Sequence, residues 1–410
     1  MSFDVCLHNS GYESTNSSMF VKSEGAFLFD AAGRKYLDAG LGAGSQILGH
    51  AHSAITEAIV NQAKSGCLYL QNNPVVQEFV KSVSDVLPVC LSDIVLCNTG
   101  TEATQRALRL ARAATGKDRI AYFHGGWHGM NEWTLLDDGG RFGTAKPINP
   151  SGIPRQVLDN SLVLPYNDEE AFSIIKQHAN ELACVIIEPV QGSNPRTDIV
   201  EFLSELREVC TKFNILLVFD EIITGFRLGI SGATIFFGIN PDIATYGKIL
   251  GGGLPIGLLA FTRKVADLTY NNSAMTMLTG GTFSANPLVC AAASKTINIL
   301  RDSDYGELTH LGDFLLNKTN KALAENNIPF TMTGCDSIFR LAFTDKKFKN
   351  RLERDLYECP PEVQKRFRAE MLKNSVIWPT NGIIFIGFCH NRDMLADLSE
   401  QILMSASKCL

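Results

Sequence analysis

Several features that would place this chain in other functional classes are missing from its sequence. No apolar run approaches the roughly 18 residues that span a bilayer, and the polar N-terminal segment lacks the apolar core of a secretory signal. The net charge of -6 at pH 7 gives no basic footprint for nucleic acid. The 11 cysteines contain no Cys-x-x-Cys pair, which argues against a zinc knuckle or a redox motif. We therefore expect a cytoplasmic protein that binds neither membrane nor nucleic acid.

The composition that remains is that of a large globular enzyme. With 410 residues, of which 45% are hydrophobic and 20% charged, the chain can bury a core shared between a large and a smaller domain. Between residues 93 and 262, short apolar runs alternate with helical patterns, which indicates an α/β fold with a mainly parallel sheet between helices. The predicted strands of this sheet are 93–97, 120–123, 161–164, 183–187, 215–219, 243–246 and 256–262.

Both ends of the chain are expected outside this sheet. Residues 1–20 are interpreted as an arm, 26–30 with 35–38 as a hairpin, and the glycine-rich segment 40–45 as a loop. Strands are predicted near 337–343 and 383–388, and helices at 306–326, 361–374 and 392–407.

Two neighbouring strand ends deliver the residues of one specific chemistry. The apolar run 216–219 ends at Asp220, and the run 243–246 is followed by Gly247 and Lys248. Ligands of open α/β sheets bind at the carboxyl ends of the strands. A lysine there can form a Schiff base with an aldehyde cofactor, while an aspartate pairs with its protonated pyridine nitrogen. Taken singly, each feature is more often a solvated strand end or a surface turn, so the assignment depends on other segments.

Two of those segments combine glycine with polar or aromatic side chains. The sequence at 98–103 (Asn-Thr-Gly-Thr-Glu-Ala) lies between a strand and a helix, where amides and hydroxyls make a phosphate cradle or an ordinary threonine cap. The sequence at 124–129 (His-Gly-Gly-Trp-His-Gly) has two histidines four apart, but its glycines disfavour the helix that a metal pair needs. Trp127 is interpreted as an aromatic platform for a flat ring, or as a tryptophan packed under a loop.

Two further segments complete the set. Glu188 follows the strand 183–187, and the loop 280–287 opens a helix, where a second phosphate contact can form. Alone, the first is better explained as a solvated strand end and the second as a plain loop.

Taken together and in this order, the segments resemble the class III pyridoxal-phosphate-dependent aminotransferases, which have the aspartate-aminotransferase-like fold (fold type I). Within that family the chain is most similar to the glutamate-1-semialdehyde 2,1-aminomutases. The most specific parts are 98–103, 219–227, 246–257 and 281–287. The resemblance implies a large cofactor-binding domain with a seven-stranded sheet, and a smaller α+β domain built from both chain ends. The implied divisions are an N-terminal arm and part of the small domain over 1–52, the large domain over 53–302, and the C-terminal small domain over 303–410.

The resemblance also implies the residues of the site. Lys248 would hold pyridoxal 5'-phosphate as a Schiff base and act as general base and acid, and Asp220 would keep the pyridine nitrogen protonated. Trp127 and Ile222 would pack on the two ring faces. Thr282 would reach the phosphate of a neighbouring subunit, which makes the active unit a homodimer with a shared site. The full set of expected cofactor-binding residues, with no metal, is Thr99, Gly100, Thr101, Trp127, His128, Glu188, Asp220, Ile222, Lys248 and Thr282.

The sequence departs from the family where substrates are recognised. Ser193 replaces a glutamate that many members have, and 383–388 offers no arginine to hold a donor carboxylate. The Ser-Trp pair that the aminomutases have at Gly42-Ala43, and their acidic residue near Gly382, are also absent.

These departures favour an aminotransferase over an aminomutase. We predict amino transfer from an amino acid, with L-glutamate as the expected donor, to a carbonyl acceptor such as a keto-sugar or another biosynthetic intermediate. Two alternatives stay open. An aminomutase would return the amine to the same carbon skeleton, and an inert relative would serve as a binding or scaffold protein. The intact Lys248 and Asp220 argue against inertness.

Overall fold

A seven-stranded sheet forms the largest part of the computed structural model, which describes residues 19–135, 152–270 and 280–410. The strand order is β4-β10-β9-β8-β7-β5-β6, and only β10 runs antiparallel to its neighbours. Every strand bound lies within one residue of its predicted position, so the predicted fold class is confirmed. The strands are β4 Asp93–Cys97, β5 Arg119–Phe123, β6 Ser161–Leu164, β7 Leu182–Ile187, β8 Leu216–Asp220, β9 Ile243–Gly247 and β10 Gly257–Phe261.

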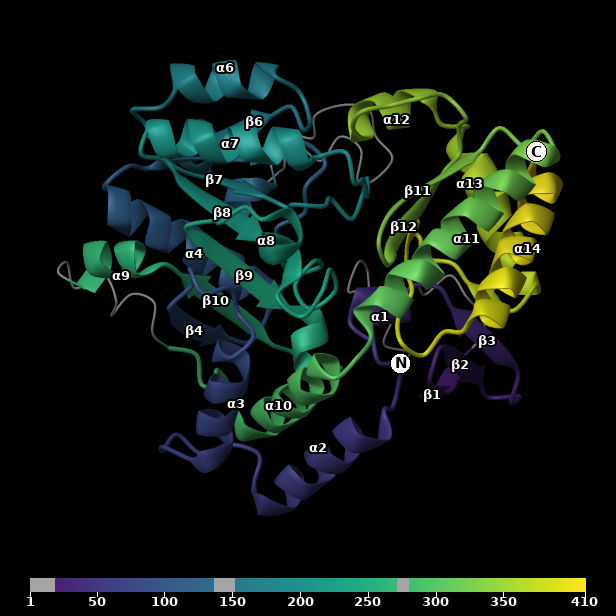
Figure 1. Cartoon of the computed structure of the whole chain (residues 1–410), viewed down its shortest axis with the longest axis horizontal. Coiled ribbons are helices and arrows are strands. Elements are labelled where there is room, and N and C mark those ends of the chain that lie inside the picture. The colour runs from purple at the N-terminus through teal and green to yellow at the C-terminus, as the bar shows by residue number, and fades with distance from the viewer. Residues whose placement is uncertain (1–18, 136–151, 271–279) are drawn as a thin grey trace, which may run out of the picture.

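Helices cover both faces of this sheet, as the apolar strands require. Alternate residues of each strand point to opposite faces, so that Leu217 and Phe219 join one buried cluster while Leu216 and Val218 join the other. The first cluster packs on α3 Pro74–Ser84, α6 Glu170–Gln177, α7 Val200–Lys212 and α10 Pro287–Arg301, and the second packs on α4 Gly100–Thr115 and α9 Arg263–Tyr270. Figure 1 shows α6 and α7 together along one face.

Both chain ends build the smaller part of the molecule. The N-terminal strands form a sheet in the order β1-β2-β3-β13, in which Val376 of β13 pairs with Leu37 of β3. A second small sheet, β11-β12-β14, is antiparallel. The elements are β1 Phe20–Glu24, β2 Phe27–Asp30, β3 Lys35–Asp38, β11 Thr331–Cys335, β12 Ile338–Ala342, β13 Val376–Ile377, β14 Ile383–Phe385, α11 Tyr305–Glu325, α12 Arg351–Tyr357, α13 Pro361–Lys373 and α14 Arg392–Cys409. The division at residues 52 and 302 stays a prediction.

The remaining elements are short or connect these parts. They are α2 Ser53–Ser65, α5 Arg155–Asp159, α8 Gly232–Phe237 and the 3-10 turns Glu132–Thr134 and Lys248–Gly251. Among the described residues, no helix combines the length and apolar character needed to cross a membrane.

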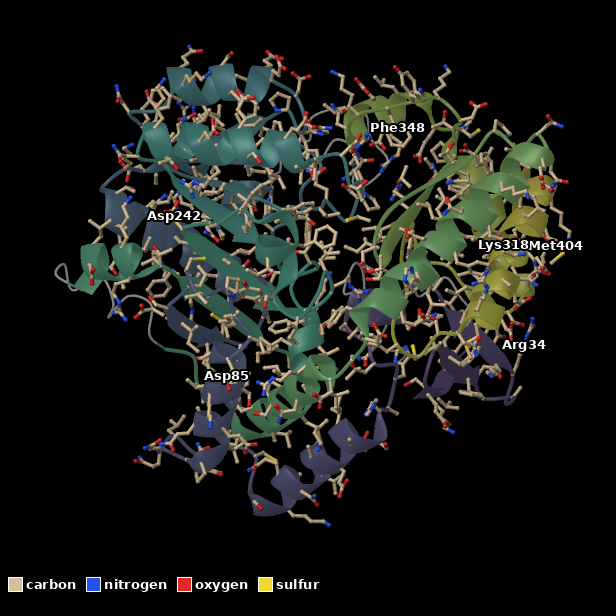
Figure 2. All side chains as sticks on the ribbon, viewed as in Figure 1. Arg34, Asp85, Asp242, Lys318, Phe348 and Met404 are labelled. Carbon is tan, nitrogen blue, oxygen red and sulfur yellow. The ribbon has the colours of Figure 1, made fainter. Side chains whose placement is uncertain are left out.

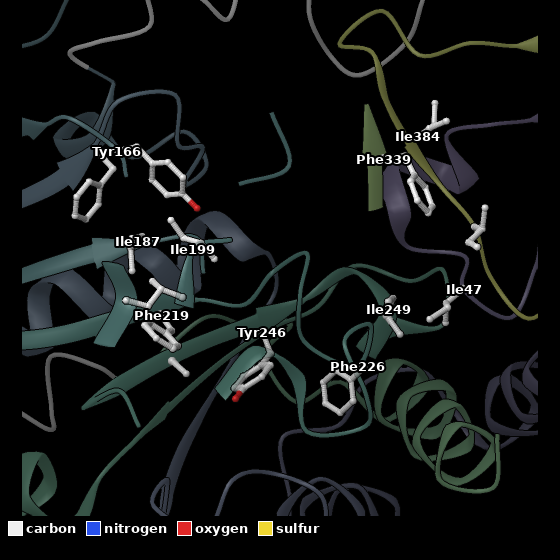
Figure 3. Packing of buried hydrophobic residues seen from close by; sticks show 14 of the residues in the cluster. Ile47, Tyr166, Ile187, Ile199, Phe219, Phe226, Tyr246, Ile249, Phe339 and Ile384 are labelled. Atoms are coloured by element: carbon white, nitrogen blue, oxygen red, sulfur yellow. The ribbon is translucent and has the colours of Figure 1, made fainter. Parts of the chain in front are cut away.

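One continuous apolar core joins the large sheet to the small sheets. Phe219 and Tyr246 lie in the cluster under the strand ends of the large sheet, and Phe339 and Ile384 belong to the same cluster on the small-sheet side. Figure 3 shows Ile47 and Ile249 between these two groups. The strand ends are therefore held in a fixed relation to β12 and β14.

A buried arginine also crosses this boundary. The guanidinium of Arg227 donates to the carbonyl oxygens of Gly44 at 2.7 Å and Ile386 at 2.9 Å, and to Ser337 Oγ at 3.2 Å. Burial lowers the pKa of Arg227 to about 10, so the group stays charged at neutral pH. A hydrogen-bonded charge in this position ties three separate segments together.

Two local expectations are corrected. The predicted arm is too long, because β1 begins at Phe20, and residues 1–18 lie outside the described chain. The glycine-rich segment contains a left-handed turn, α1 Leu41–Gly44, in which φ is +42°, +58°, +56° and +82° for the successive residues. The carboxylate of Asp38 holds this turn by accepting from the amides of Gly40 and Gly42.

At the start of α7 stands Asp198, a residue type that often caps helices. The residue at the cap is Ile199, and no side chain caps the helix. The Asp198 carboxylate instead accepts from the Arg196 guanidinium at 2.5 and 2.7 Å. An ion pair two residues away has displaced the local backbone bond.

Candidate active site

The carboxyl ends of β8 and β9 bring Asp220 and Lys248 to one edge of the sheet. The two strands pair in parallel, with Asp220 opposite Thr245, and Lys248 follows β9 directly. Asp220 is 2% exposed. Lys248 is half-buried and has φ of +43°, a left-handed conformation that side chains other than glycine rarely adopt. Such a backbone at a site residue is found where the surrounding structure fixes it for function.

Asp220 is held on both carboxylate oxygens. Oδ2 lies 2.7 Å from Nδ1 of His128, which is buried as well. Oδ1 accepts from the Ile222 amide at 3.1 Å and from Thr245 Oγ1 at 3.3 Å. A buried carboxylate with these partners has a fixed orientation.

Glu188, at the end of β7, organises the next part of the edge. Oε1 accepts from the Trp127 amide at 2.7 Å, and Oε2 accepts from the Gly192 amide at 3.2 Å. Burial raises the pKa of Glu188, and the nearby negative charge of Asp220 adds to the rise. Glu188 therefore positions the segment that presents Trp127, whose side chain is half-buried.

The predicted phosphate cradle lies at the start of α4. Thr99 caps the helix, because its Oγ1 accepts from the Glu102 amide at 3.1 Å, and Thr101 Oγ1 accepts from the Met130 amide at 3.2 Å. Each hydroxyl keeps an O–H that can donate to an anion. The first-turn amides of a helix have no intrahelical acceptor, so this end favours a phosphate.

Ile222 connects the cradle to the lysine. An ideal Cβ on Gly100 would lie 2.9 Å from Ile222 Cδ1, and one on Gly247 would lie 3.1 Å from the same atom. The absence of side chains at both glycines lets α4 and the Lys248 turn close around Ile222. Nine of the ten predicted residues thus belong to the ends of β4, β5, β7, β8 and β9, which meet at one sheet edge.

Thr282 is placed differently from the others. It lies exposed in the turn that precedes α10. Ser284 in the same turn accepts from Asn98 Nδ2 at 3.4 Å, and the Gly280 carbonyl accepts from Arg106 at 2.9 Å. The turn therefore lies beside the cradle while Thr282 faces outward.

Comparisons with known proteins agree with this arrangement. A family model described as aminotransferase class-III matches residues 9–354. The chain belongs to the class III aminotransferase family. A glutamate-1-semialdehyde 2,1-aminomutase from Sulfolobus acidocaldarius is 36% identical over 93% of this chain and 90% of its own length.

Two solved structures show the same fold. An omega-transaminase from Sphaerobacter thermophilus has a TM-score of 0.87 and 26% identity, with 97% of this chain and 92% of the transaminase covered. A transaminase with PLP bound has a TM-score of 0.86 and 25% identity, with the same coverage of each chain.

The cofactor of this class III aminotransferase is pyridoxal 5'-phosphate, and the residues present fit it. Among the described residues, His128 is the one ion-pair partner of the Asp220 carboxylate. Such a carboxylate can accept a hydrogen bond from the protonated nitrogen of a pyridine ring. The α4 start and the half-buried Lys248 provide an anion site and an amine on the same edge.

Two contributors to this class III aminotransferase site are missing from the predicted set. Thr245 orients Asp220 through its hydroxyl. Arg227 holds the turn Leu41–Gly44 by donating to the Gly44 carbonyl oxygen. Arg227 ends the motif 219–227, but a buried arginine cannot be told from an exposed one by its neighbours in sequence. Thr245 had a signal, because it lies near the carboxyl end of the predicted strand 243–246, three residues before Lys248.

Proposed function

We propose that this class III aminotransferase moves an amino group from an amino acid, with L-glutamate as the expected donor, to a carbonyl acceptor such as a keto-sugar or another biosynthetic intermediate. The observation that carries the proposal is the meeting of Lys248, the buried Asp220 and the α4 start at one sheet edge. The ten free cysteines of the described chain support a reducing, cytoplasmic location.

The proposed roles follow from the positions. When bound, pyridoxal 5'-phosphate supplies an aldehyde and a ring that accepts electrons from the substrate's α-carbon. Lys248 Nζ would hold the aldehyde carbon and then take and return the α-proton. Asp220 would keep the ring nitrogen protonated, and its contact with His128 would fix the orientation of the Asp220 carboxylate.

The other predicted residues would bind and orient. Thr99, Gly100 and Thr101 would hold the phosphate through hydroxyls and amides. Trp127 and Ile222 would enclose the ring, and Glu188 would fix the Trp127 segment. The outward position of Thr282 supports its proposed contact with a partner subunit's phosphate, and hence a homodimer with a shared site.

An aminomutase is the second candidate, and the named relative supports it more directly than it supports a glutamate-dependent aminotransferase. Against it stand the positions where this chain departs from the aminomutase pattern, Gly42-Ala43 and Gly382. In the structure, the first two lie in the left-handed turn and the third has φ of +72°. None of them presents a polar side chain toward a substrate.

The visible absorbance of the purified protein, before and after addition of L-glutamate, separates the candidates. If the protein is an aminotransferase, L-glutamate removes the visible absorbance of the lysine-bound cofactor. One 2-oxoglutarate per site is then released in the absence of an acceptor. An aminomutase shows no release of keto acid, since the amine stays on the substrate skeleton. Lys248→Ala serves as the control, because it retains the fold without the covalent attachment.

A further inference from the structure

Arg340, on the small-sheet side of the site, has no ion-pair partner in the part of the chain that the structure describes. Arg340 is in β12, directly opposite Ile383 of β14. Its guanidinium donates to the Asn381 carbonyl oxygen, and its buried Nε has no hydrogen-bond partner in the described chain. Within the ranges that the structure describes, no Asp or Glu lies within ion-pair distance of Arg340. Four of its five N–H donors therefore have no acceptor there.

Gly382 creates the space for this guanidinium. An ideal Cβ on Gly382 would lie 3.1 Å from Nη1 and 3.3 Å from Cζ of Arg340. A side chain at this position would press on the guanidinium, which would have to shift by a few tenths of an ångström. Where the aminomutases have an acidic residue, this chain therefore has Gly382 with the guanidinium of Arg340 beside it.

The geometry directs Arg340 toward the cofactor side. Directly opposed residues of an antiparallel pair lie on the same face of a sheet, so Arg340 shares its face with Ile383. Ile383 Cδ1 lies 3.4 Å from an ideal Cβ on Gly192, and the Gly192 amide donates to Glu188. Two contacts therefore separate the strand that carries Arg340 from the carboxylate that holds Trp127.

Two more arginines surround this position, and both belong to α12. Arg354 is 1% exposed, donates to the Ser193 carbonyl oxygen and pairs with Asp355 at 2.6 Å. Arg351 pairs with the same Asp355 at 3.3 Å, and its Cδ lies 3.0 Å from an ideal Cβ on Gly125, close to Trp127. Glu358 lies 3.4 Å from Arg354. Asp355 and Glu358 thus pair with Arg351 and Arg354, and neither carboxylate is an ion-pair partner of Arg340 in the described chain.

α12 is fastened to the loop that follows β7. The Phe348 carbonyl oxygen accepts from Arg196 Nη1 at 2.5 Å, and the Lys349 carbonyl oxygen accepts from Asn194 Nδ2 at 3.5 Å. Figure 2 labels Phe348 at the point where this part of the chain approaches the large sheet. The arginines of α12 are therefore held at the boundary next to the cofactor edge.

We propose that Arg340 is the anchor of an anion subsite, which binds a carboxylate or phosphate group of the substrate through its planar guanidinium. The inference rests on the proposed function, because the anion is a part of the molecule that gives or receives the amino group. A guanidinium suits this task, because its N–H groups match the two oxygens of either anion.

The environment of Arg340 favours an anionic partner. Burial, together with the positive charges of Arg354 and Arg351, lowers the pKa of Arg340 to about 9. The group is still charged at neutral pH. Burial and the neighbouring positive charges disfavour this charge, and a bound anion would stabilise it.

Isothermal titration of the holoenzyme with pyrophosphate and with glutarate tests the proposal. Arg340→Gln is expected to lower the affinity for the preferred anion about 10-fold to 100-fold, which is the range that charge-assisted hydrogen bonds give. The affinity of Arg340→Lys should lie between those of the wild type and Arg340→Gln, since lysine keeps the charge and lacks the planar guanidinium. Arg301→Gln is the matched control, because Arg301 pairs with Asp85 at 3.7 Å on the surface of the large part and should leave the affinity unchanged.

The two probes distinguish the sources of the anion. Stronger binding of pyrophosphate would identify a phosphate-bearing substrate, and stronger binding of glutarate a dicarboxylate. Equal affinity in wild type and Arg340→Gln, or no binding of either anion by the wild type, overturns the proposal. The visible absorbance of Arg340→Gln should match the wild type. A failure of the proposed function would appear instead in the response to L-glutamate, which this titration does not use.

Discussion

Replacing Asp220 with asparagine tests the electrostatic centre of the site. The substitution preserves the side-chain volume and removes the negative charge. Asp220 is buried, and both of its oxygens are engaged, by His128 on one side and by Ile222 and Thr245 on the other. An asparagine can replace the oxygen on one side only, and it cannot hold a proton on a ring nitrogen by charge.

The expected loss follows from the burial. Removing one partner of a buried, hydrogen-bonded charge pair costs about 3–5 kcal/mol. If this loss falls on the transition state, kcat/KM decreases about 10²-fold to 10⁴-fold, since each 1.36 kcal/mol is roughly a factor of ten. The fold should remain intact, because no volume is lost and burial no longer opposes a charge.

The assay is the steady-state rate of amino transfer, measured with cofactor-saturated protein, and far-ultraviolet circular dichroism checks the fold. Asp242→Asn is the matched control. Asp242 lies at the amino end of β9, labelled in Figure 2, where its carboxylate accepts from the Leu217 amide and from Arg207, each at 2.8 Å. Asp242→Asn should lower stability and leave the rate per folded molecule unchanged. A rate within threefold of wild type for Asp220→Asn would refute the assignment, as would an equal loss in the control.

Three further predictions concern single residues. Lys248→Ala should abolish turnover and the absorbance of the lysine-bound cofactor, while circular dichroism stays unchanged; any sustained turnover contradicts its role. Arg227→Met should leave three buried oxygens without a donor, which costs about 2–4 kcal/mol and lowers Tm by about 2–5 °C in calorimetry for a chain of this size, whereas an unchanged Tm means that these bonds contribute nothing. Burial lowers the pKa of His390 from 6.5 to about 4. The unfolded chain therefore binds a proton between those pH values that the folded chain does not, so that stability falls as pH falls, by about 3 kcal/mol at pH 4. His390→Gln should flatten the dependence of Tm on pH over this window, and parallel curves for the two proteins would contradict it.

The sequence was most informative where local pattern and burial coincide. The strands of the large sheet are short apolar runs, and the residues that follow them are polar, so the strand bounds and the positions of Asp220, Glu188 and Lys248 could be predicted together. Sheet topology then places strand ends at one edge, whatever the details of the loops.

The substrate side could not be predicted in this way. The segment 383–388 contains no arginine, yet Arg340 lies beside Gly382 because β12 pairs with β14. That contact joins residues 42 positions apart in sequence, and no local pattern reports it. The same limit applies to Asp198, for which a nearby Arg196 competes with the helix end. Long-range pairing and side-chain competition decide such positions.

The left-handed turn at Leu41–Gly44 limits how this enzyme can change its substrate range. The turn lies beside the Lys248 segment, since an ideal Cβ on Gly253 would lie 2.9 Å from Gln46 Nε2. Each of its residues has positive φ, which for residues other than glycine, asparagine and aspartate costs roughly 1–2 kcal/mol. A side chain in place of Gly42 would therefore add backbone strain, and Ala43 already carries this cost. β12 and β14 are extended and accept any side chain without such strain. For enzyme engineering, the turn Leu41–Gly44 is therefore constrained by its backbone. The strands that carry Arg340 and Ile383 are the part of the site where side chains can be changed.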